Sequence, residues 1–256
     1  MQFEHEEKVY RTVADVSLPI HIFRPDDEEV RPAIVFFFGG GWKGGTPRQF
    51  FPHCEYFASR GMVAASAEYR VQSRHGVSPP DCVSDAKAAV RWLRAHAPEL
   101  GVDPGRVAAG GGSAGGHLAA CTGTVHGFDA DCESSGVRCV PDALVLFNPV
   151  VDTTRWAERF GDDCDAACPI KHIGEHTPPT IIFHGTADTT VPFADVERFQ
   201  FHMKACGRRC DLVPFAGQKH AFFNHGRDEN RWYIETVRAA DRFLASLGFL
   251  DGEPTI

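Results

Sequence analysis

The amino-acid sequence predicts an α/β fold, in which a mostly parallel central sheet of about eight strands carries helices on both faces. Apolar segments and amphipathic segments alternate from residue 32 onward, which is typical of parallel strands joined by crossover helices. The segment 32–38, PAIVFFF, is apolar throughout, as expected of a strand that is buried on both faces. The segment 81–97 instead spaces its apolar residues as one face of a helix does.

Each remaining element rests on its own stretch of sequence. Segments such as DALVLF at 142–147 and PTIIFH at 179–184 are short and apolar, which favours strands. Strands are expected at residues 8–13, 17–23, 32–38, 62–68, 106–111, 142–147, 179–184 and 211–215. Helices are expected at residues 81–97, 114–125, 193–206 and 229–247. The chain is therefore interpreted as one domain over residues 1–256.

Two long irregular segments, 127–141 and 148–178, interrupt this alternation. Irregular segments of such length in a compact domain are usually functional or carry short helices. Ligands of α/β proteins bind at the carboxyl ends of the strands. Both segments are therefore expected to cover that edge of the sheet and to form a small lid.

Charge and hydropathy exclude several classes of protein. The net charge of −8 argues against a nucleic-acid partner, because phosphate contacts need clustered lysine and arginine. No apolar run approaches the ~18 residues of a membrane span. The first residues, MQFEHEEKVYRT, lack the basic start and apolar core of a signal peptide. This favours the cytoplasm, although a secreted chain that has lost its signal would look the same.

The nine cysteines do not decide between a cytoplasmic and a secreted protein. Three pairs lie close in sequence: Cys132 and Cys139, Cys164 and Cys168, and Cys206 and Cys210. None has the CxxC spacing of a metal site, so no metal is expected. The first two pairs fall in expected loops, where both disulfides and free thiols fit the sequence.

The stretch AAGGGSAGGHLAA at 108–120 surrounds one serine, Ser113, with five glycines. Residues 111–115 fit the pattern G-x-S-x-G between an expected strand and an expected helix, which is a nucleophile elbow. This turn holds the serine in a strained conformation and presents its oxygen above the sheet. The N–H of Ala114 then lies at a helix N-terminus, where it faces developing negative charge.

Two other glycine-rich loops do not fit the stretch around Ser113. A P-loop requires a lysine after its last glycine, and none is present. A G-x-G-x-x-G dinucleotide pattern can be read at 110–115, but no second strand precedes the position about 20 residues on where its acidic residue is expected. No nucleotide cofactor is therefore expected.

An elbow serine needs a base and an orienting acid, in the chain order serine, acid, histidine. Asp188 follows the strand at 179–184, and His220 follows the strand at 211–215. Both then lie at the same edge of the sheet as Ser113. His220 would accept the proton of Ser113 as general base, and Asp188 would hold the imidazole in the required tautomer.

Several neighbouring polar residues are assigned to other roles. Asp152 and Asp195 are alternatives to Asp188 as the orienting acid. His117 and His184 are interpreted as parts of the scaffold. A further pair, Arg70 after the strand at 62–68 and Asp85 on the next helix, is expected to form a buried ion pair.

Acyl transfer also requires donors for the developing oxyanion. The sequence FFFGGGWKGG at 36–45 directly follows the strand at 32–38. Because they lack side chains, Gly40 and Gly41 can direct backbone N–H groups to the point that the Ala114 N–H faces. Trp42 is expected to form a wall of the substrate pocket.

With these pieces in this order, the chain resembles the α/β-hydrolase fold. More narrowly, it resembles the carboxylesterase and acetylesterase group with an HGGGW-type loop, which is related to hormone-sensitive lipase. The resemblance rests on the segments GGGW at 39–42, EYR at 68–70, GGSAGGH at 111–117 and HGTAD at 184–188, and on His220. It implies a serine carboxylester hydrolase that cleaves short-chain, acetyl-like esters through an acyl-enzyme without a cofactor.

Two departures from that group bear on the substrate. Phe38 stands where the group usually has a histidine before the glycines, which puts the support of the loop in doubt. The large N-terminal cap of hormone-sensitive-lipase relatives is missing, so the site is expected to be open and to favour short acyl chains. Cap-less relatives include esterases that remove acetyl or feruloyl groups from plant polysaccharides, and a carbohydrate ester is therefore a candidate substrate.

Two other functions stay open at this point. A serine peptidase or amidase of the same fold would use the same three residues. A non-catalytic, ligand-binding relative would also share the fold, although such proteins usually lose a member of the triad. The sequence leaves the oligomeric state undetermined.

Overall fold

The computed structural model describes residues 5–27, 29–129 and 136–256. Its strands are β1 (Glu6–Val13), β2 (Val16–Phe23), β3 (Arg31–Phe37), β4 (Val63–Ala67), β5 (Val102–Gly112), β6 (Ala143–Phe147), β7 (Thr180–Gly185) and β8 (Cys210–Phe215). Its α-helices are α1 (Phe51–Ser59), α2 (Gln72–His75), α3 (Pro79–Ala95), α4 (Ala97–Leu100), α5 (Ala114–Thr124), α7 (Ala157–Phe160), α8 (Phe193–Ala205) and α9 (Arg231–Ala245).

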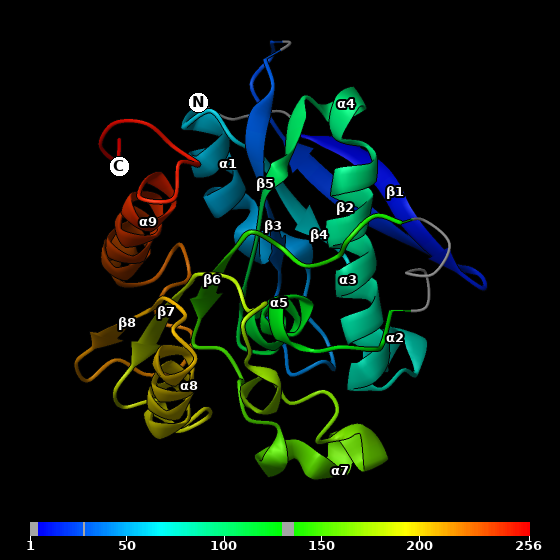
Figure 1. Cartoon of the computed structure of the whole chain (residues 1–256), viewed down its shortest axis with the longest axis vertical. Coiled ribbons are helices and arrows are strands. Elements are labelled where there is room, and N and C mark those ends of the chain that lie inside the picture. Colours follow the sequence, from blue (N-terminus) through cyan, green and yellow to red (C-terminus); the bar gives the residue numbers. More distant parts are fainter. Residues whose placement is uncertain (1–4, 28, 130–135) are drawn as a thin grey trace.

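The strands form one eight-stranded sheet in the order β1-β2-β4-β3-β5-β6-β7-β8 (Figure 1). The pairs β1–β2 and β2–β4 are antiparallel, and every pair from β4 to β8 is parallel. The mostly parallel α/β sheet that the sequence predicts is therefore confirmed. In the part of the chain that the structure describes, no helix has the length and hydropathy that crossing a membrane requires.

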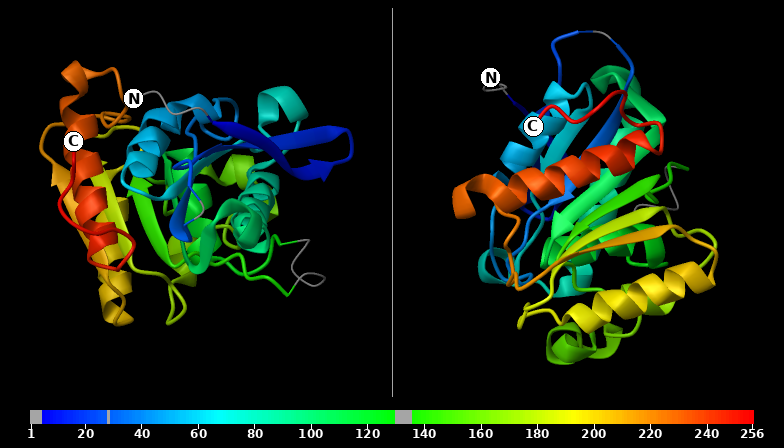
Figure 2. Two further views of the ribbon diagram at one scale, coloured as in Figure 1. Left: turned by 90° about the horizontal axis from the view of Figure 1, so that it is seen from above. Right: turned by 90° about the vertical axis from the view of Figure 1, so that its left-hand side faces the viewer.

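Helices cover both faces of this sheet, as Figures 1 and 2 show. One face carries α1 and α9, which are joined by the bond from Tyr56 Oη–H to Asp241 Oδ2 at 2.6 Å. The other face carries α3, α5 and α8, and Lys87 of α3 donates to the carbonyl of Val125 beyond α5 at 2.6 Å. The central strand β3 is buried from Ala33 to Phe37, so the double-sided burial expected of PAIVFFF is found.

Two features of the fold differ from the sequence-based expectation. Helix α1, FPHCEYFAS, was not predicted, because its mixed composition lacks a clean apolar stripe; Pro52 occupies its first turn, where proline is tolerated. Strand β5 begins at Val102 rather than at residue 106. Proline and glycine, here Pro104 and Gly105, are typical of loops, but Val102 pairs with Arg31 across a register irregularity.

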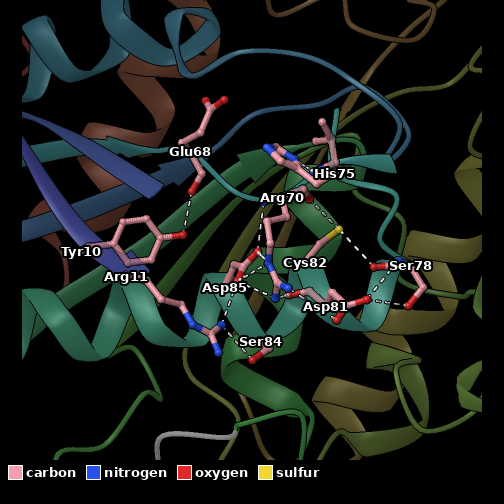
Figure 3. Close-up of polar contacts among 11 residues, drawn as sticks. Tyr10, Arg11, Glu68, Arg70, His75, Ser78, Asp81, Cys82, Ser84 and Asp85 are labelled. Carbon is pink, nitrogen blue, oxygen red and sulfur yellow. Dashed lines mark hydrogen bonds and ion pairs between the residues drawn. The ribbon is translucent and has the colours of Figure 1, made fainter. Parts of the chain in front are cut away.

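A buried ion network joins the strand β1 to helix α3 (Figure 3). Arg70 Nε lies 2.9 Å from Asp85 Oδ2, and Arg11 Nη1 lies 2.8 Å from Asp85 Oδ1. The Asp85 carboxylate is fully buried and also accepts the backbone N–H of Arg70 at 3.0 Å. The expected Arg70–Asp85 pair is confirmed, and Arg11 is a third member that the sequence did not reveal. A buried carboxylate with these partners fixes the antiparallel edge of the sheet to its helical layer.

The cysteines that the structure describes are free thiols, so a disulfide between Cys164 and Cys168 is ruled out. Both sulfur atoms contact Thr153 instead of each other. The backbone N–H of Thr153 donates to Cys168 Sγ at 3.4 Å, and Cys164 Sγ lies 3.6 Å from the hydroxyl of Thr153. Cys139 is also a free thiol, and Cys132 lies outside the described residues. Burial raises the pKa of Cys168, which disfavours the reactive thiolate.

A buried histidine, His53 of α1, has no hydrogen-bond partner on either ring nitrogen within the described residues. The rings of Phe50, Tyr233 and Phe147 surround it, with centroids at 4.8, 4.9 and 5.3 Å. Burial lowers the pKa of His53 to about 3. His53 therefore stays neutral in the folded protein at every pH near neutrality.

Replacing this histidine by leucine (His53→Leu) is expected to make the protein less sensitive to acid. Below about pH 6.5 the unfolded chain binds a proton at this histidine and the folded chain does not. The free energy of unfolding of the wild type therefore falls by about 1.4 kcal/mol per pH unit on this account as the pH drops, until the folded-state pKa is reached. Urea unfolding at pH 7, 6 and 5 measures how steeply the free energy of unfolding depends on pH in the wild type and in His53→Leu. The exposed His202→Leu is the control, and equal slopes for wild type and His53→Leu would contradict the expectation.

Candidate active site

The residues singled out by the sequence gather where the parallel strands end. Ser113 follows β5, and the glycine loop that contains Gly40 and Gly41 follows β3. Asp188 follows β7, and His220 follows β8. Since the carboxyl ends of parallel strands share one edge of a sheet, four separate loops deliver these residues to one place.

Ser113 occupies the sharp turn between β5 and α5 with a φ of 55° and a ψ of −118°. Its N–H continues the sheet by donating to the carbonyl of Phe147 at 2.9 Å, and its own carbonyl accepts from His117 N–H at 2.9 Å as α5 begins. Non-glycine residues rarely adopt this conformation, and such strain is typical of functional sites. The turn therefore has the geometry expected of a nucleophile elbow.

The glycines around Ser113 are required by close packing. A Cβ on Gly115 would lie 2.0 Å from the carbonyl oxygen of Phe37, and a Cβ on Gly111 would lie 2.4 Å from the carbonyl oxygen of Gly115. Gly110, for which the sequence suggested no role, leaves room for the ring of Phe36, 2.7 Å from where its Cβ would be. The elbow thus presses directly against the end of the neighbouring strand β3.

A continuous line of hydrogen bonds joins Asp188, His220 and Ser113. The Ser113 hydroxyl lies 2.9 Å from His220 Nε2, and His220 Nδ1 lies 2.6 Å from Asp188 Oδ2. With Asp188 ionised, Nδ1–H donates to the carboxylate and Nε2 is free to accept the serine proton. The structure brings together the three residues that the sequence placed on three different loops.

Asp188 is kept ionised by its surroundings. Burial opposes its ionisation, but hydrogen bonds from His184, from His220 and from the N–H of Val191 outweigh burial and hold the pKa of Asp188 well below its ordinary value. Val191 N and Thr190 N donate to Oδ1 at 2.9 and 2.8 Å, and Oδ2 contacts His220 Nδ1 at 2.6 Å and His184 Nε2 at 3.4 Å. The carboxylate is therefore both charged and fixed in orientation.

The two alternative acids have other partners. Asp152 and Asp195 both accept from Arg198 Nη2, at 2.7 and 2.9 Å. His117 is also engaged elsewhere: its Nδ1 accepts from Trp42 Nε1–H at 3.3 Å, and its Nε2 lies 2.8 Å from the carbonyl of Ala167. Burial lowers the pKa of His117 to about 4, so it is a neutral packing residue.

The glycine loop after β3 lines the same cleft as Ser113. Gly40 has a φ of 134°, and a Cβ there would lie 2.1 Å from the carbonyl oxygen of Gly44, so only glycine fits. Among the described residues, no acceptor binds the N–H of Gly40 or of Gly41. Ala114 is the first residue of α5, and the N–H groups of a first helical turn have no intrahelical acceptor. These are the three donors that the sequence assigned to an oxyanion hole.

An aromatic contact supports this loop where relatives of the resembled group use a histidine. The ring of Phe38 stacks on Tyr69 with centroids 4.1 Å apart, and Tyr69 Oη–H donates to the carbonyl of Phe38 at 2.8 Å. Gln49 Oε1 accepts from Gly39 N–H at 2.7 Å. These contacts replace the missing histidine as the support of the loop.

A cleft of about 880 Å³ opens onto Ser113 and His220. Trp42 is one of its lining residues, although only 2% of that residue is exposed. The segment 148–178 contributes Val150, Trp156 and Arg159 to its walls. No described residue of 127–141 does so; Val137 instead accepts a hydrogen bond from Arg91 of α3 at 2.9 Å. For its described part, the lid expected from 127–141 is therefore not found over the cleft.

Asn148 is a residue of this cleft that the sequence reasoning missed. It follows β6 directly, is fully buried, and has a φ of 35°. Its Oδ1 accepts the N–H of Ala221, next to His220, at 3.0 Å, and its Nδ2 has no partner in the described chain. A polar residue at the end of a buried strand was the available signal. Asn148 thus ties the β6 loop to the loop of the histidine.

Replacing Asn148 by alanine (Asn148→Ala) is expected to lower kcat by about tenfold, because the N–H of Ala221 would lose its buried acceptor and the adjoining His220 would be less well fixed. KM is expected to change less than kcat. Steady-state kinetics on a soluble ester measures both. An unchanged kcat would show that this hydrogen bond does not position the histidine.

No metal ligand set accompanies these residues. Across residues 5–27, 29–129 and 136–256, no three His, Cys, Asp or Glu side chains are arranged to hold a metal ion.

Comparison with known proteins places the chain in a class. The model of the BD-FAE family matches residues 20–163, which include the glycine loop and the elbow. The structure is similar to Thermogutta terrifontis esterase 2 phosphorylated by paraoxon, with 52% identity, a TM-score of 0.94, and coverage of 99% of this chain and 98% of that chain. The propionate-bound form of that esterase is 50% identical with a TM-score of 0.94, covering 98% and 97%.

A curated relative is also named as an ester hydrolase. LipM of Mycobacterium tuberculosis, named a probable carboxylic ester hydrolase, is 30% identical over 88% of this chain and 57% of its own length. The fold and these similarities define an α/β-hydrolase of the esterase class. The chain belongs to the BD-FAE family. It spans somewhat more than half the length of LipM and of LipC, an esterase of the same organism.

Proposed function

We propose that this protein is a serine carboxylic ester hydrolase that forms an acyl-enzyme on Ser113. The observation that carries the proposal is the unbroken line of hydrogen bonds, 2.6 and 2.9 Å long, from Asp188 through His220 to the Ser113 hydroxyl. Gly40 and Gly41, whose N–H groups have no acceptor among the described residues, line the same cleft. This arrangement matches the requirements for acyl transfer in nucleophile, base, orienting acid and oxyanion donors.

The proposed reaction has two halves. Ser113 Oγ attacks the ester carbonyl carbon while its proton passes to His220 Nε2, and the carbonyl oxygen becomes an oxyanion held by backbone N–H groups. The C–O bond to the alcohol then breaks, and His220 returns the proton to the leaving oxygen. Water attacks the acyl-enzyme with His220 again as base, which releases the carboxylic acid and restores Ser113.

The acyl group is proposed to be short. The lining of the cleft includes the bulky rings of Trp42 and Phe223 and, from α7 of the segment 148–178, Arg159. The similar Thermogutta esterase has been solved with propionate and with butyrate bound, which supports acids of a few carbons. A carbohydrate ester remains the proposed natural class of substrate, on the grounds of the open site.

Two measurements test the proposal. Hydrolysis of 4-nitrophenyl acetate, butyrate and octanoate, beside acetylated xylan, is expected to be fastest for the short esters. Incubation with paraoxon is expected to abolish turnover and to add one diethyl phosphate group, located by peptide mass spectrometry on Ser113. The similar Thermogutta esterase has been solved in a form phosphorylated by paraoxon.

The same measurements distinguish the alternatives. Cleavage of anilide or peptide substrates at rates equal to esters would favour a peptidase or amidase. Absence of both turnover and paraoxon labelling would favour a ligand-binding protein without catalysis.

A further inference from the structure

The cleft differs in charge from the rest of the molecule. The chain carries 34 acidic against 26 basic residues, yet no aspartate or glutamate lines the cleft around Ser113. Two arginines, Arg48 and Arg159, do line it. The protein has a net charge of −8. The charged side chains that line its cleft are nevertheless both cationic, and such a cleft attracts anions.

Arg48 is the cation in this cleft that is available to a ligand. Most described arginines are held by carboxylates; Arg60, for example, lies 2.7 Å from Asp241. Arg159 donates to the carbonyl of Gly41 at 3.2 Å and lies over the ring of Trp42. The guanidinium of Arg48 has neither a carboxylate nor another hydrogen-bond partner within the described chain, and it is exposed.

The position of Arg48 relates it to the leaving group. Its neighbour Gln49 donates to Asn224 Oδ1 at 2.8 Å, which fixes the segment of Arg48 beside the loop that carries His220. His220 must protonate the departing alcohol oxygen. An alcohol half that departs past His220 would therefore pass the segment that carries Arg48.

A second groove, of about 540 Å³, adjoins the cleft at His220. Its lining includes Lys219 and Arg227 and one acidic residue, Asp228. None of the three has an ion-pair partner among the described residues. Both hollows that border His220 are thus lined by an excess of positive charge.

We infer that the ester cleaved by this protein carries a carboxylate on its alcohol half, so that the substrate is an O-acylated hydroxy acid, and that Arg48, supported by Lys219, selects it. The inference rests on the proposed esterase function and adds the chemical class of the leaving group. O-acylated uronic acid sugars are one set of compounds in this class.

The test compares 4-acetoxybenzoate with its neutral methyl ester, which share the acetyl group and the phenol ring. Each kcat/KM is divided by the rate of hydrolysis of the same compound by hydroxide. At low ionic strength the wild type is expected to favour the anion by about tenfold, and the preference is expected to decline toward unity at ~0.5 M salt.

Matched variants locate the origin of the preference. Arg48→Gln is expected to lower the ratio of anionic to neutral kcat/KM by about fivefold, and Lys219→Gln by about twofold. Arg155→Gln is the control, since Arg155 is exposed and lies outside both hollows. Its ratio is expected to equal that of the wild type.

Each other outcome counts against the inference. Equal normalised rates for the two esters, or the same ratio in wild type and Arg48→Gln, would overturn it while leaving the esterase function intact. A preference for 4-nitrophenyl hydrogen succinate over its methyl ester would place the anion on the acyl half and overturn the assignment. If the wild type hydrolysed none of these esters, the proposed function would fail, and the inference with it.

Discussion

Replacing Ser113 by alanine (Ser113→Ala) is expected to lower kcat for a short ester by about 10⁶-fold. The hydroxyl is the proposed nucleophile, and the 2.9 Å contact with His220 is its route of activation. Without it no acyl-enzyme can form, and only binding and the oxyanion donors remain to accelerate hydrolysis. Measurement requires protein purified apart from any wild-type enzyme, with 4-nitrophenyl acetate as substrate.

The fold is expected to survive this change, because alanine occupies the same space and the backbone of the turn is held by both β6 and α5. Circular dichroism and the urea midpoint are expected to match those of the wild type. Ser59→Ala, which removes a hydroxyl on α1 far from the cleft lining, is the control and keeps full activity. Turnover by Ser113→Ala within a hundredfold of the wild type would refute the serine mechanism.

Replacing Asp188 by asparagine (Asp188→Asn) is expected to lower kcat by about 10⁴-fold with little change in KM. The carboxylate accepts Nδ1–H of His220 at 2.6 Å and thereby leaves Nε2 free to accept the serine proton. An amide can offer an N–H to Nδ1 instead, which favours the wrong tautomer. The comparison variant is Asp195→Asn, whose carboxylate is paired with Arg198 and not with the histidine.

Asp188→Asn also has a consequence for stability. The pKa of Asp188 is lower in the folded protein than in the unfolded chain. Ionised Asp188 therefore stabilises the fold at any pH above the ordinary carboxyl pKa. This stabilisation is lost as the pH falls toward the lower pKa of the folded protein. The variant is therefore expected to be less stable than wild type at pH 7, with the difference narrowing toward pH 2. A kcat equal to that of wild type would remove Asp188 from the mechanism.

The parallel sheet and the three catalytic candidates were predictable because each has a strong local signal. A strand buried on both faces must be apolar, as PAIVFFF is. A sharp strand-to-helix turn that leaves no room for a Cβ beside the next strand must have glycine there, as Gly115 shows: its Cβ would lie 2.0 Å from the carbonyl oxygen of Phe37. Asp188 and His220 could be placed because polar residues that end strands share one edge of the sheet.

The features that escaped prediction depend on contacts distant in sequence. Arg11 joins Asp85 across 74 positions, and Asn148 holds the N–H of Ala221 across 73. Neither pairing leaves a local pattern. The thiol state of Cys164 and Cys168 was open because their spacing fits both a disulfide and free thiols; in the structure both sulfurs contact Thr153 instead.

The elbow, the acid and the histidine are each anchored to a separate strand, whereas Trp156 and Arg159 reach the cleft from short helical turns within 154–160. The residues proposed to break the ester bond and this part of the cleft wall therefore belong to different structural elements. Substitutions at positions 154–160 are therefore expected to change the wall of the cleft while leaving the strand-anchored Ser113, Asp188 and His220 in place. Libraries confined to residues 154–160 are accordingly a promising starting point for moving this enzyme to new esters.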